Sequence, residues 1–178
     1  MLSSFKKKLK PNQKILAVSK LQSIDKIKKL QSEGQIDFGE NYIQEALEKI
    51  EQLKKLKLVW HLIGPIQSNK VKYLKNNFEY IHSVDSLKIA QMISNQAEKI
   101  NYIQKIFIQV NISHEKSKSG FSIEELKKSW TEIYQMKNIK VADGALDISE
   151  ISLGCMRISE MENQEISTLI HTALDEGI

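Results

Sequence analysis

The chain has 178 residues, of which 41% are hydrophobic and 27% are charged, and these proportions exclude a disordered protein and suit one domain with a sizeable core. The net charge of +4 is modest, and the lysines stand beside glutamates in helical segments, so we expect no nucleic-acid partner. The single cysteine, Cys155, excludes an internal disulfide, and no apolar run is long enough to cross a membrane or to act as a secretion signal. We therefore expect a cytoplasmic protein with no membrane partner.

Short apolar runs alternate with amphipathic segments along the chain, roughly one pair every 20–25 residues. This alternation is typical of parallel sheets built from strand-helix-strand units, and it predicts the α/β class. The expected strands span 14–19, 36–38, 58–63, 80–84 and 105–110, and the expected helices span 23–33, 43–53, 69–74, 86–99 and 123–134.

Polar and turn residues follow five successive strands of this scheme. In a parallel sheet all carboxyl ends share one edge, where ligand sites form. The residues are Lys20, Glu40 with Asn41, Gly64 with Pro65, Asp85, and Asn111. We interpret Lys20 as a desolvated amine able to attack a carbonyl, although a lysine marking a strand end in solvent is the alternative.

Three further residues are candidates for this edge, each with a plain structural alternative. Asn41 either directs a hydrogen bond into the site or caps the next helix. His61 either lines the pocket or is a satisfied core histidine, and Lys118 either supplies a second amine from a lid or lies on surface. No histidines or cysteines stand at metal-ligand spacing, and no dinucleotide or Walker motif is present.

Six motifs resemble the pyridoxal-phosphate homeostasis protein family, in that family's order and spacing, over about residues 14–135. They are residues 17–20 (AVSK), 38–42 (FGENY), 60–70 (WHLIGPIQSNK), 81–85 (IHSVD), 109–113 (QVNIS) and 116–120 (KSKSG). The resemblance implies a parallel (β/α) TIM-barrel-like fold of the alanine racemase N-terminal type. It also implies a non-catalytic role in cofactor homeostasis. We expect pyridoxal-phosphate-dependent apo-enzymes as recipients and a monomer or weak dimer as the assembly.

In that family pyridoxal 5′-phosphate is held as a Schiff base, and the resemblance assigns that bond to Lys20. Asn41, His61 and Asn111 fall on positions facing the cofactor side of the family barrel. With Lys118 in the following loop, these residues form the expected cofactor site.

The chain departs from the family pattern after about residue 135. The family's Ser-Met-Gly-Met-Ser stretch, and its Gly-Ser-Thr loop followed by an arginine, are absent. Residues 140–157 and 165–178 instead resemble the opening of an aldo-keto reductase. We therefore predict a truncated barrel at 1–139 and an aldo-keto-reductase-like fragment at 140–178 that packs as final strand(s) and helix.

An internal deletion is the alternative to this fusion, because residues 151–156 (ISLGCM) faintly echo the pyridoxal family's late motif. In either case we expect an incomplete barrel that binds the cofactor weakly. Two other functions stay open: a fragment of an NADPH-dependent oxidoreductase, and a gene remnant that binds nothing.

Overall fold

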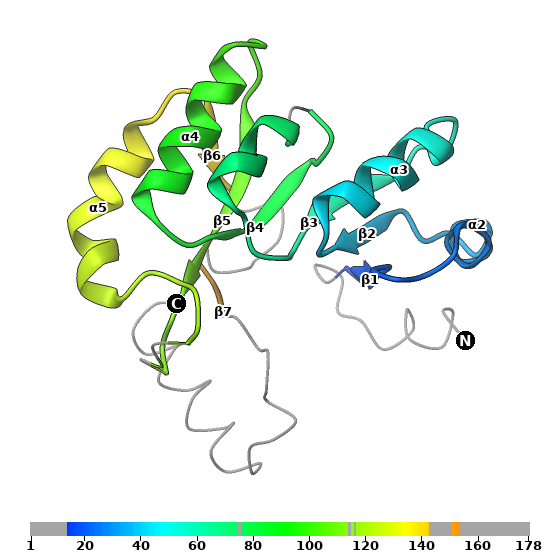
Figure 1. Cartoon of the computed structure of the whole chain (residues 1–178), viewed down its shortest axis with the longest axis horizontal. Helices are drawn as coiled ribbons and strands as arrows, with labels where there is room; N and C mark the ends of the chain where they lie inside the picture. Colours follow the sequence, from blue (N-terminus) through cyan, green and yellow to red (C-terminus); the bar gives the residue numbers. More distant parts are fainter. Residues whose placement is uncertain (1–13, 75, 114, 116, 143–150, 154–178) are drawn as a thin grey trace.

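The computed structural model describes residues 14–74, 76–113, 115, 117–142 and 151–153. Its strands form one parallel sheet in the order β1-β2-β3-β4-β5-β6, with β7 paired to β5 beyond the end of β6. The elements, drawn in Figure 1, are β1 Ala17–Val18, α2 Ile24–Ser32, β2 Asp37–Glu40, α3 Ile43–Leu53, β3 Val59–Leu62, the 3₁₀-helix η1 Ser68–Tyr73, β4 Tyr80–Val84, α4 Leu87–Glu98, β5 Gln104–Val110, α5 Ile123–Gln135, β6 Ile139–Val141 and β7 Ile151–Leu153.

Three helices, α2, α4 and α5, begin after a serine that accepts a hydrogen bond from the first turn. Ser23 accepts from the Lys26 N–H at the start of α2, and Ser86 caps α4 in the same way. Ser122 forms a reciprocal pair of bonds with Glu125 at the start of α5. A serine oxygen satisfies one of the free N–H groups that every helix start carries, so each helix begins at a defined residue.

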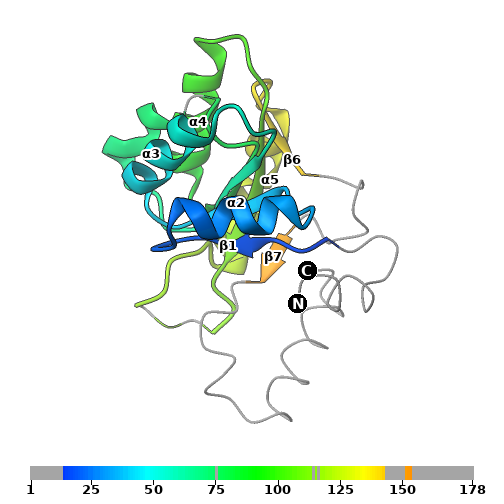
Figure 2. The same ribbon diagram turned by 90° about the vertical axis from the view of Figure 1, so that its right-hand side faces the viewer.

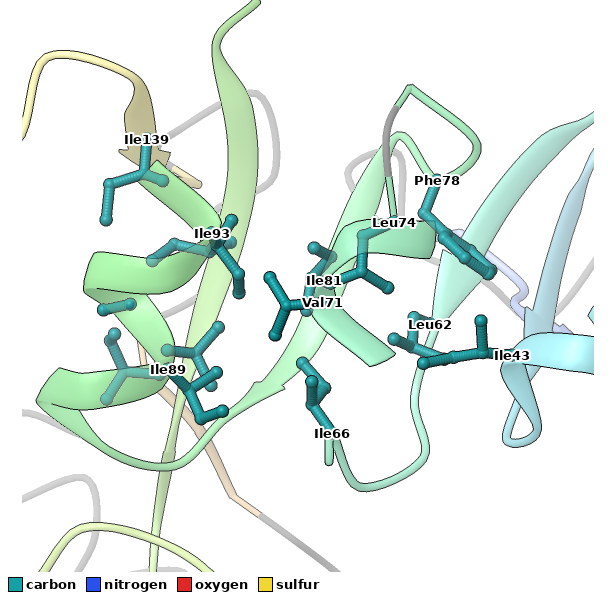
Figure 3. Close-up of a cluster of buried hydrophobic side chains, with 14 of the residues drawn as sticks. Ile43, Leu62, Ile66, Val71, Leu74, Phe78, Ile81, Ile89, Ile93 and Ile139 are labelled. Carbon is teal, nitrogen blue, oxygen red and sulfur yellow. The ribbon is translucent and has the colours of Figure 1, made fainter. Parts of the chain in front are cut away.

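The hydrophobic core lies between the sheet and the helices on one of its sides. Along β5, Ile106, Ile108 and Val110 alternate toward this side, as successive side chains in a strand point to opposite faces. Figure 3 shows Ile81 of β4 meeting Val71 of η1, with α4 residues beyond them. Figure 1 places α3, α4 and α5 on this same side of the curved sheet.

The opposite face of the sheet carries polar and aromatic side chains instead. His61, Tyr80, His82 and Phe107 contact one another across β3, β4 and β5. In a closed (β/α) barrel this face points inward, so we call it the inner face. β1 forms one edge of the sheet, and α2 lies next to it in both views (Figures 1 and 2).

The predicted α/β class and the parallel order are confirmed, and β4 has the bounds predicted for it. The first strand is shorter than expected, with two residues in place of six. The helix expected near 69–74 is a 3₁₀-helix. β6 crosses the predicted boundary at residue 139 and pairs with β5, as β7 does, so residues on both sides of that boundary belong to one sheet. The predicted helix at 165–178 lies outside the described residues.

Candidate functional site

The carboxyl ends of the strands lie along one edge of the sheet because every described pairing is parallel. Lys20 follows β1, Asn41 follows β2 and Asn111 follows β5. This edge is where the sequence predicts a binding site. The structure brings the backbones of these residues to it, and their side chains then differ in what they contact.

Lys20 stands in a turn directly after β1, and its side chain is exposed. Within the described part of the chain its amine makes no hydrogen bond and no ion pair. The expectation of a desolvated lysine is therefore wrong for this structure, whose described residues leave the side chain in contact with solvent. No described carboxylate pairs with the amine, so no ion pair has to break before a ligand reaches it.

Asn41 is half-buried at the end of β2, and its side-chain oxygen is buried with no hydrogen-bond partner among the described residues. A buried amide oxygen without a donor is costly, and such a group invites a ligand donor. The alternative of a helix cap is wrong, because Tyr42 is the N-cap residue of α3. Gly64 packs on the Asn41 backbone so closely that an added Cβ would lie 2.2 Å from the Asn41 carbonyl oxygen.

His61 is buried on the inner face and has a partner at both ring nitrogens. Its Nε2 lies 3.1 Å from Asp37 Oδ1, and its Nδ1 lies 2.9 Å from His82 Nε2. The ring also stacks on Tyr80 at a centroid distance of 4.8 Å. With the Asp37 carboxylate accepting a hydrogen bond from the His61 Nε2–H, the His61 Nδ1 accepts a hydrogen bond from the Nε2–H of a neutral His82. His61 thus belongs to a hydrogen-bonded chain inside the sheet's curve.

His82 completes that chain and was not singled out in the sequence. Burial and then the neighbouring His61 lower the pKa of His82 from 6.5 to about 4. Its ring stacks on Phe107 with centroids 4.4 Å apart. The histidine therefore stays neutral at physiological pH and serves as a hydrogen bonder.

Asn111 and Lys118 are occupied by their own loop. The Asn111 amide donates to the carbonyls of Glu115 and Lys118 at 2.9 and 3.1 Å. The Lys118 amine lies 2.8 Å from a Glu115 carboxylate oxygen and 3.2 Å from Ser113 Oγ. Gly120, with φ +136°, closes this loop against Asn111 in a conformation that favours glycine. Asn111 thus shapes the loop, while Lys118 is paired rather than free.

A buried ionic cluster, not predicted from the sequence, lies behind Lys20. Glu40 is fully buried, and one of its oxygens accepts from Ser19 Oγ at 2.6 Å and from Lys49 Nζ at 2.7 Å. Glu40 therefore points toward α3, rather than into the ring of strand-end groups expected for it. The i, i+4 spacing of Glu45 and Lys49 on α3 signals half of this cluster, but a lysine on a helix is ordinarily read as exposed.

Glu45 is held ionised by its neighbours. Burial raises the pKa of its carboxyl, but hydrogen bonds from the Lys49 amine and the Leu21 N–H, together with the Lys49 charge, bring the net pKa below its usual value. Its carboxylate is thus a permanent acceptor for the turn that carries Lys20.

The Lys20 amine at this edge fits the aldehyde of an aldehyde-bearing cofactor, and the Asn41 oxygen fits a hydrogen-bond donor elsewhere on such a ligand. Lys20 supplies a free amine and Asn41 supplies an unsatisfied acceptor beside the same strands. For the phosphate end, the sole arginine in the sequence, Arg157, lies outside the described residues. Among the described residues, no cluster of three acidic, histidine or cysteine side chains could hold a metal ion. No described helix is long and apolar enough to cross a membrane.

Comparison with known proteins matches residues 2–143 to the family model for the N-terminal domain of alanine racemase. A pyridoxal phosphate homeostasis protein of Buchnera aphidicola is 44% identical over 127 residues, which are 71% of this chain and 56% of the relative. One from Synechocystis is 36% identical over 166 residues, 92% of this chain and 76% of the relative. The chain spans about half the length of the Buchnera relative.

The fold of the chain also resembles solved structures. PipY of Synechococcus elongatus without PLP is 28% identical with a TM-score of 0.87, over 98% of this chain and 77% of that one. The same protein with PLP bound is 27% identical with a TM-score of 0.81, over 99% of this chain and 79% of that one. Alanine racemase of Clostridium difficile, at 18% identity and a TM-score of 0.62 over 78% of this chain and 36% of that one, shows the fold alone.

The Synechocystis alignment extends beyond residue 143, because it covers 92% of the chain. This overlaps the segment whose residues resemble an aldo-keto reductase. The fusion therefore stays a prediction, and this relative gives weight to its alternative, an internal deletion within one family.

Proposed function

The chain belongs to the alanine racemase N-terminal domain family, among the pyridoxal phosphate homeostasis proteins, and from this premise we propose that it binds pyridoxal 5′-phosphate covalently through Lys20. The free amine of Lys20 at the carboxyl edge of a parallel sheet carries the proposal. Its chemistry requires an unprotonated nitrogen that attacks the aldehyde carbon and a water that leaves as the Schiff base forms.

When bound, the cofactor supplies an electrophilic aldehyde and an electron-accepting ring. Asn41 is proposed to accept a hydrogen bond from the ligand through its unsatisfied oxygen. His61 and Asn111 act more remotely: His61 through its chain to His82 and Asp37, and Asn111 by shaping the loop that carries Lys118. Lys118 is proposed to supply a second amine to the ligand once its ion pair with Glu115 breaks.

The role proposed for the whole protein is storage and delivery of the cofactor without catalysis. The names of the relatives support the homeostasis part of this proposal, and the structure of PipY with PLP bound supports the binding of the cofactor. The recipients proposed are pyridoxal-phosphate-dependent apo-enzymes in the cytoplasm, and the assembly proposed is a monomer or weak dimer. No observation on the described residues favours the oxidoreductase alternative.

The test uses pyridoxal phosphate and three proteins: the wild type, Lys20→Ala, and Lys28→Ala as a matched control. Lys28 is an exposed lysine on α2, so it reports the nonspecific reaction of surface amines. We expect a saturable imine absorbance band, fixed by borohydride, in the wild type and Lys28→Ala, and none in Lys20→Ala. Equal bands in all three would show that Lys20 is not the binding residue.

A further inference from the structure

Lys49 uses all three of its ammonium donors inside the protein. It lies on α3 with 5% of its surface exposed, and its Nζ is 2.7 Å from Glu40 Oε1, 2.6 Å from Glu45 Oε1 and 2.6 Å from the Ser19 carbonyl oxygen. An ammonium group has three N–H donors, so each has one acceptor. We call Glu40, Glu45 and Lys49 the brace.

The brace binds the residues on both sides of Lys20 without touching the Lys20 side chain. On one side, Ser19 gives its carbonyl to Lys49 and its hydroxyl to Glu40 at 2.6 Å. On the other side, the Leu21 N–H donates to Glu45 Oε1 at 2.7 Å. The backbone of Lys20 is therefore fixed at its two neighbours by three side chains from β2 and α3.

The turn at Leu21 needs such an anchor. Leu21 has φ +58°, in the left-handed region that a branched side chain rarely occupies. Its own side chain is 76% exposed, so core packing does not hold it there. Two hydrogen bonds among the described residues hold this conformation: the Leu21 N–H donates to Glu45 Oε1 at 2.7 Å, and the Gln22 N–H donates to the Ser19 carbonyl at 3.0 Å.

The stability of the fold does not require a buried charge at position 49. The buried side of α3 otherwise carries apolar residues, Ile43, Ala46 and Leu53, and position 49 lies on that side. Replacing a buried ion pair by well-packed apolar groups is often neutral or stabilising, so its use points to a demand for a defined geometry.

We propose that the brace is the positioning device of the binding lysine: it fixes the turn Ser19–Leu21 so that the Lys20 amine meets the aldehyde of the cofactor in one orientation. This inference rests on the function proposed for Lys20. Glu45 is its most accessible member, since its side chain is 24% exposed and its loss leaves Lys49 paired with Glu40.

The experiment compares the wild type with Glu45→Ala, which removes the acceptor of the Leu21 N–H, and Glu45→Gln, which keeps a neutral acceptor. Two quantities are measured: hydrogen exchange at the Leu21 amide, without cofactor, and the apparent Kd for pyridoxal phosphate from the borohydride-fixed band. For Glu45→Ala we expect faster exchange at Leu21 and about tenfold weaker binding, the factor that follows from releasing one backbone residue. Glu45→Gln should stay near the wild type in both.

The outcomes separate the two claims. Unchanged Leu21 exchange in Glu45→Ala overturns the brace whether or not the cofactor binds. Unchanged binding in Glu45→Ala, with Lys20 labelled in every protein, overturns the positioning role, and so does equal loss in Glu45→Gln. A wild type with no label on Lys20 refutes the proposed function, while the exchange measurement still decides whether Glu45 holds the turn.

Discussion

His82 makes the stability of this protein depend on acid in a way that can be calculated. Burial and the nearby His61 lower its pKa in the folded state from 6.5 to about 4, whereas the unfolded chain restores the ordinary value. Between these two pH values the unfolded chain binds a proton that the folded chain does not. The contribution of His82 is therefore fully present above about pH 6.5 and is lost progressively as the pH falls toward about 4.

The size of the loss follows from the same two values. At about 1.4 kcal/mol per pKa unit, the displacement from 6.5 to about 4 corresponds to roughly 3 kcal/mol in full. About 2 kcal/mol of this is lost by pH 5, where the unfolded histidine is almost completely protonated and the folded one is mostly neutral. A domain with an ordinary stability of about 5–15 kcal/mol would register this clearly.

Urea unfolding at pH 7.5 and pH 5, followed by the fluorescence of Trp60 and Trp130, measures the loss in the wild type and in His82→Gln. Glutamine keeps an N–H donor for His61 Nδ1 but does not titrate. We expect the wild type to lose about 2 kcal/mol more than the variant on acidification. The same pH dependence in both proteins would refute the assignment of a buried, neutral His82.

Three other substitutions test the packing around the site. Gly64→Ala should cost about 3 kcal/mol of unfolding free energy, because a Cβ would meet the Asn41 backbone at 2.2 Å; a urea midpoint equal to the wild type would contradict this close approach. Ser122→Ala should lower the free energy of unfolding by about 1 kcal/mol in the same assay, because the capping bonds at the start of α5 are lost. No change would show that the cap does not stabilise the fold. Asn111→Ala should speed proteolysis between 113 and 120, since two hydrogen bonds from its amide hold that loop, and unaltered cleavage would show that the loop is held by other contacts.

The order of strands and helices could be predicted because each has a local signal. The alternation of short apolar runs with amphipathic segments predicts a parallel sheet, and it places the starts of three helices within one residue of Ile24, Leu87 and Ile123. The first strand was overestimated because an apolar run does not reveal how far its neighbour pairs with it. Among the described residues of the predicted strand, Ala17 and Val18 form the strand pairs with β2.

The directions of the side chains at the site could not be predicted from the sequence, because they depend on how neighbouring strands pair. Glu40 stands beside Asn41 in the sequence, yet it shares the helix-facing side with Phe38, because strand residues two apart point the same way. His82 meets His61 through the register of β3 and β4, which no local pattern contains. The spacing of Lys49 from Ala46 and Leu53 places it on the buried side of α3, but a charged side chain is ordinarily expected to be exposed.

Peptide mapping after borohydride reduction tests the central claim most directly. The protein is saturated with pyridoxal phosphate, reduced, digested and analysed by mass spectrometry for the modified lysine. We expect one reduced pyridoxyl-phosphate group per chain, on Lys20, with Lys118 unmodified. A label spread over surface lysines, or concentrated on Lys118 with Lys20 untouched, would contradict the assignment of Lys20 as the residue that holds the cofactor.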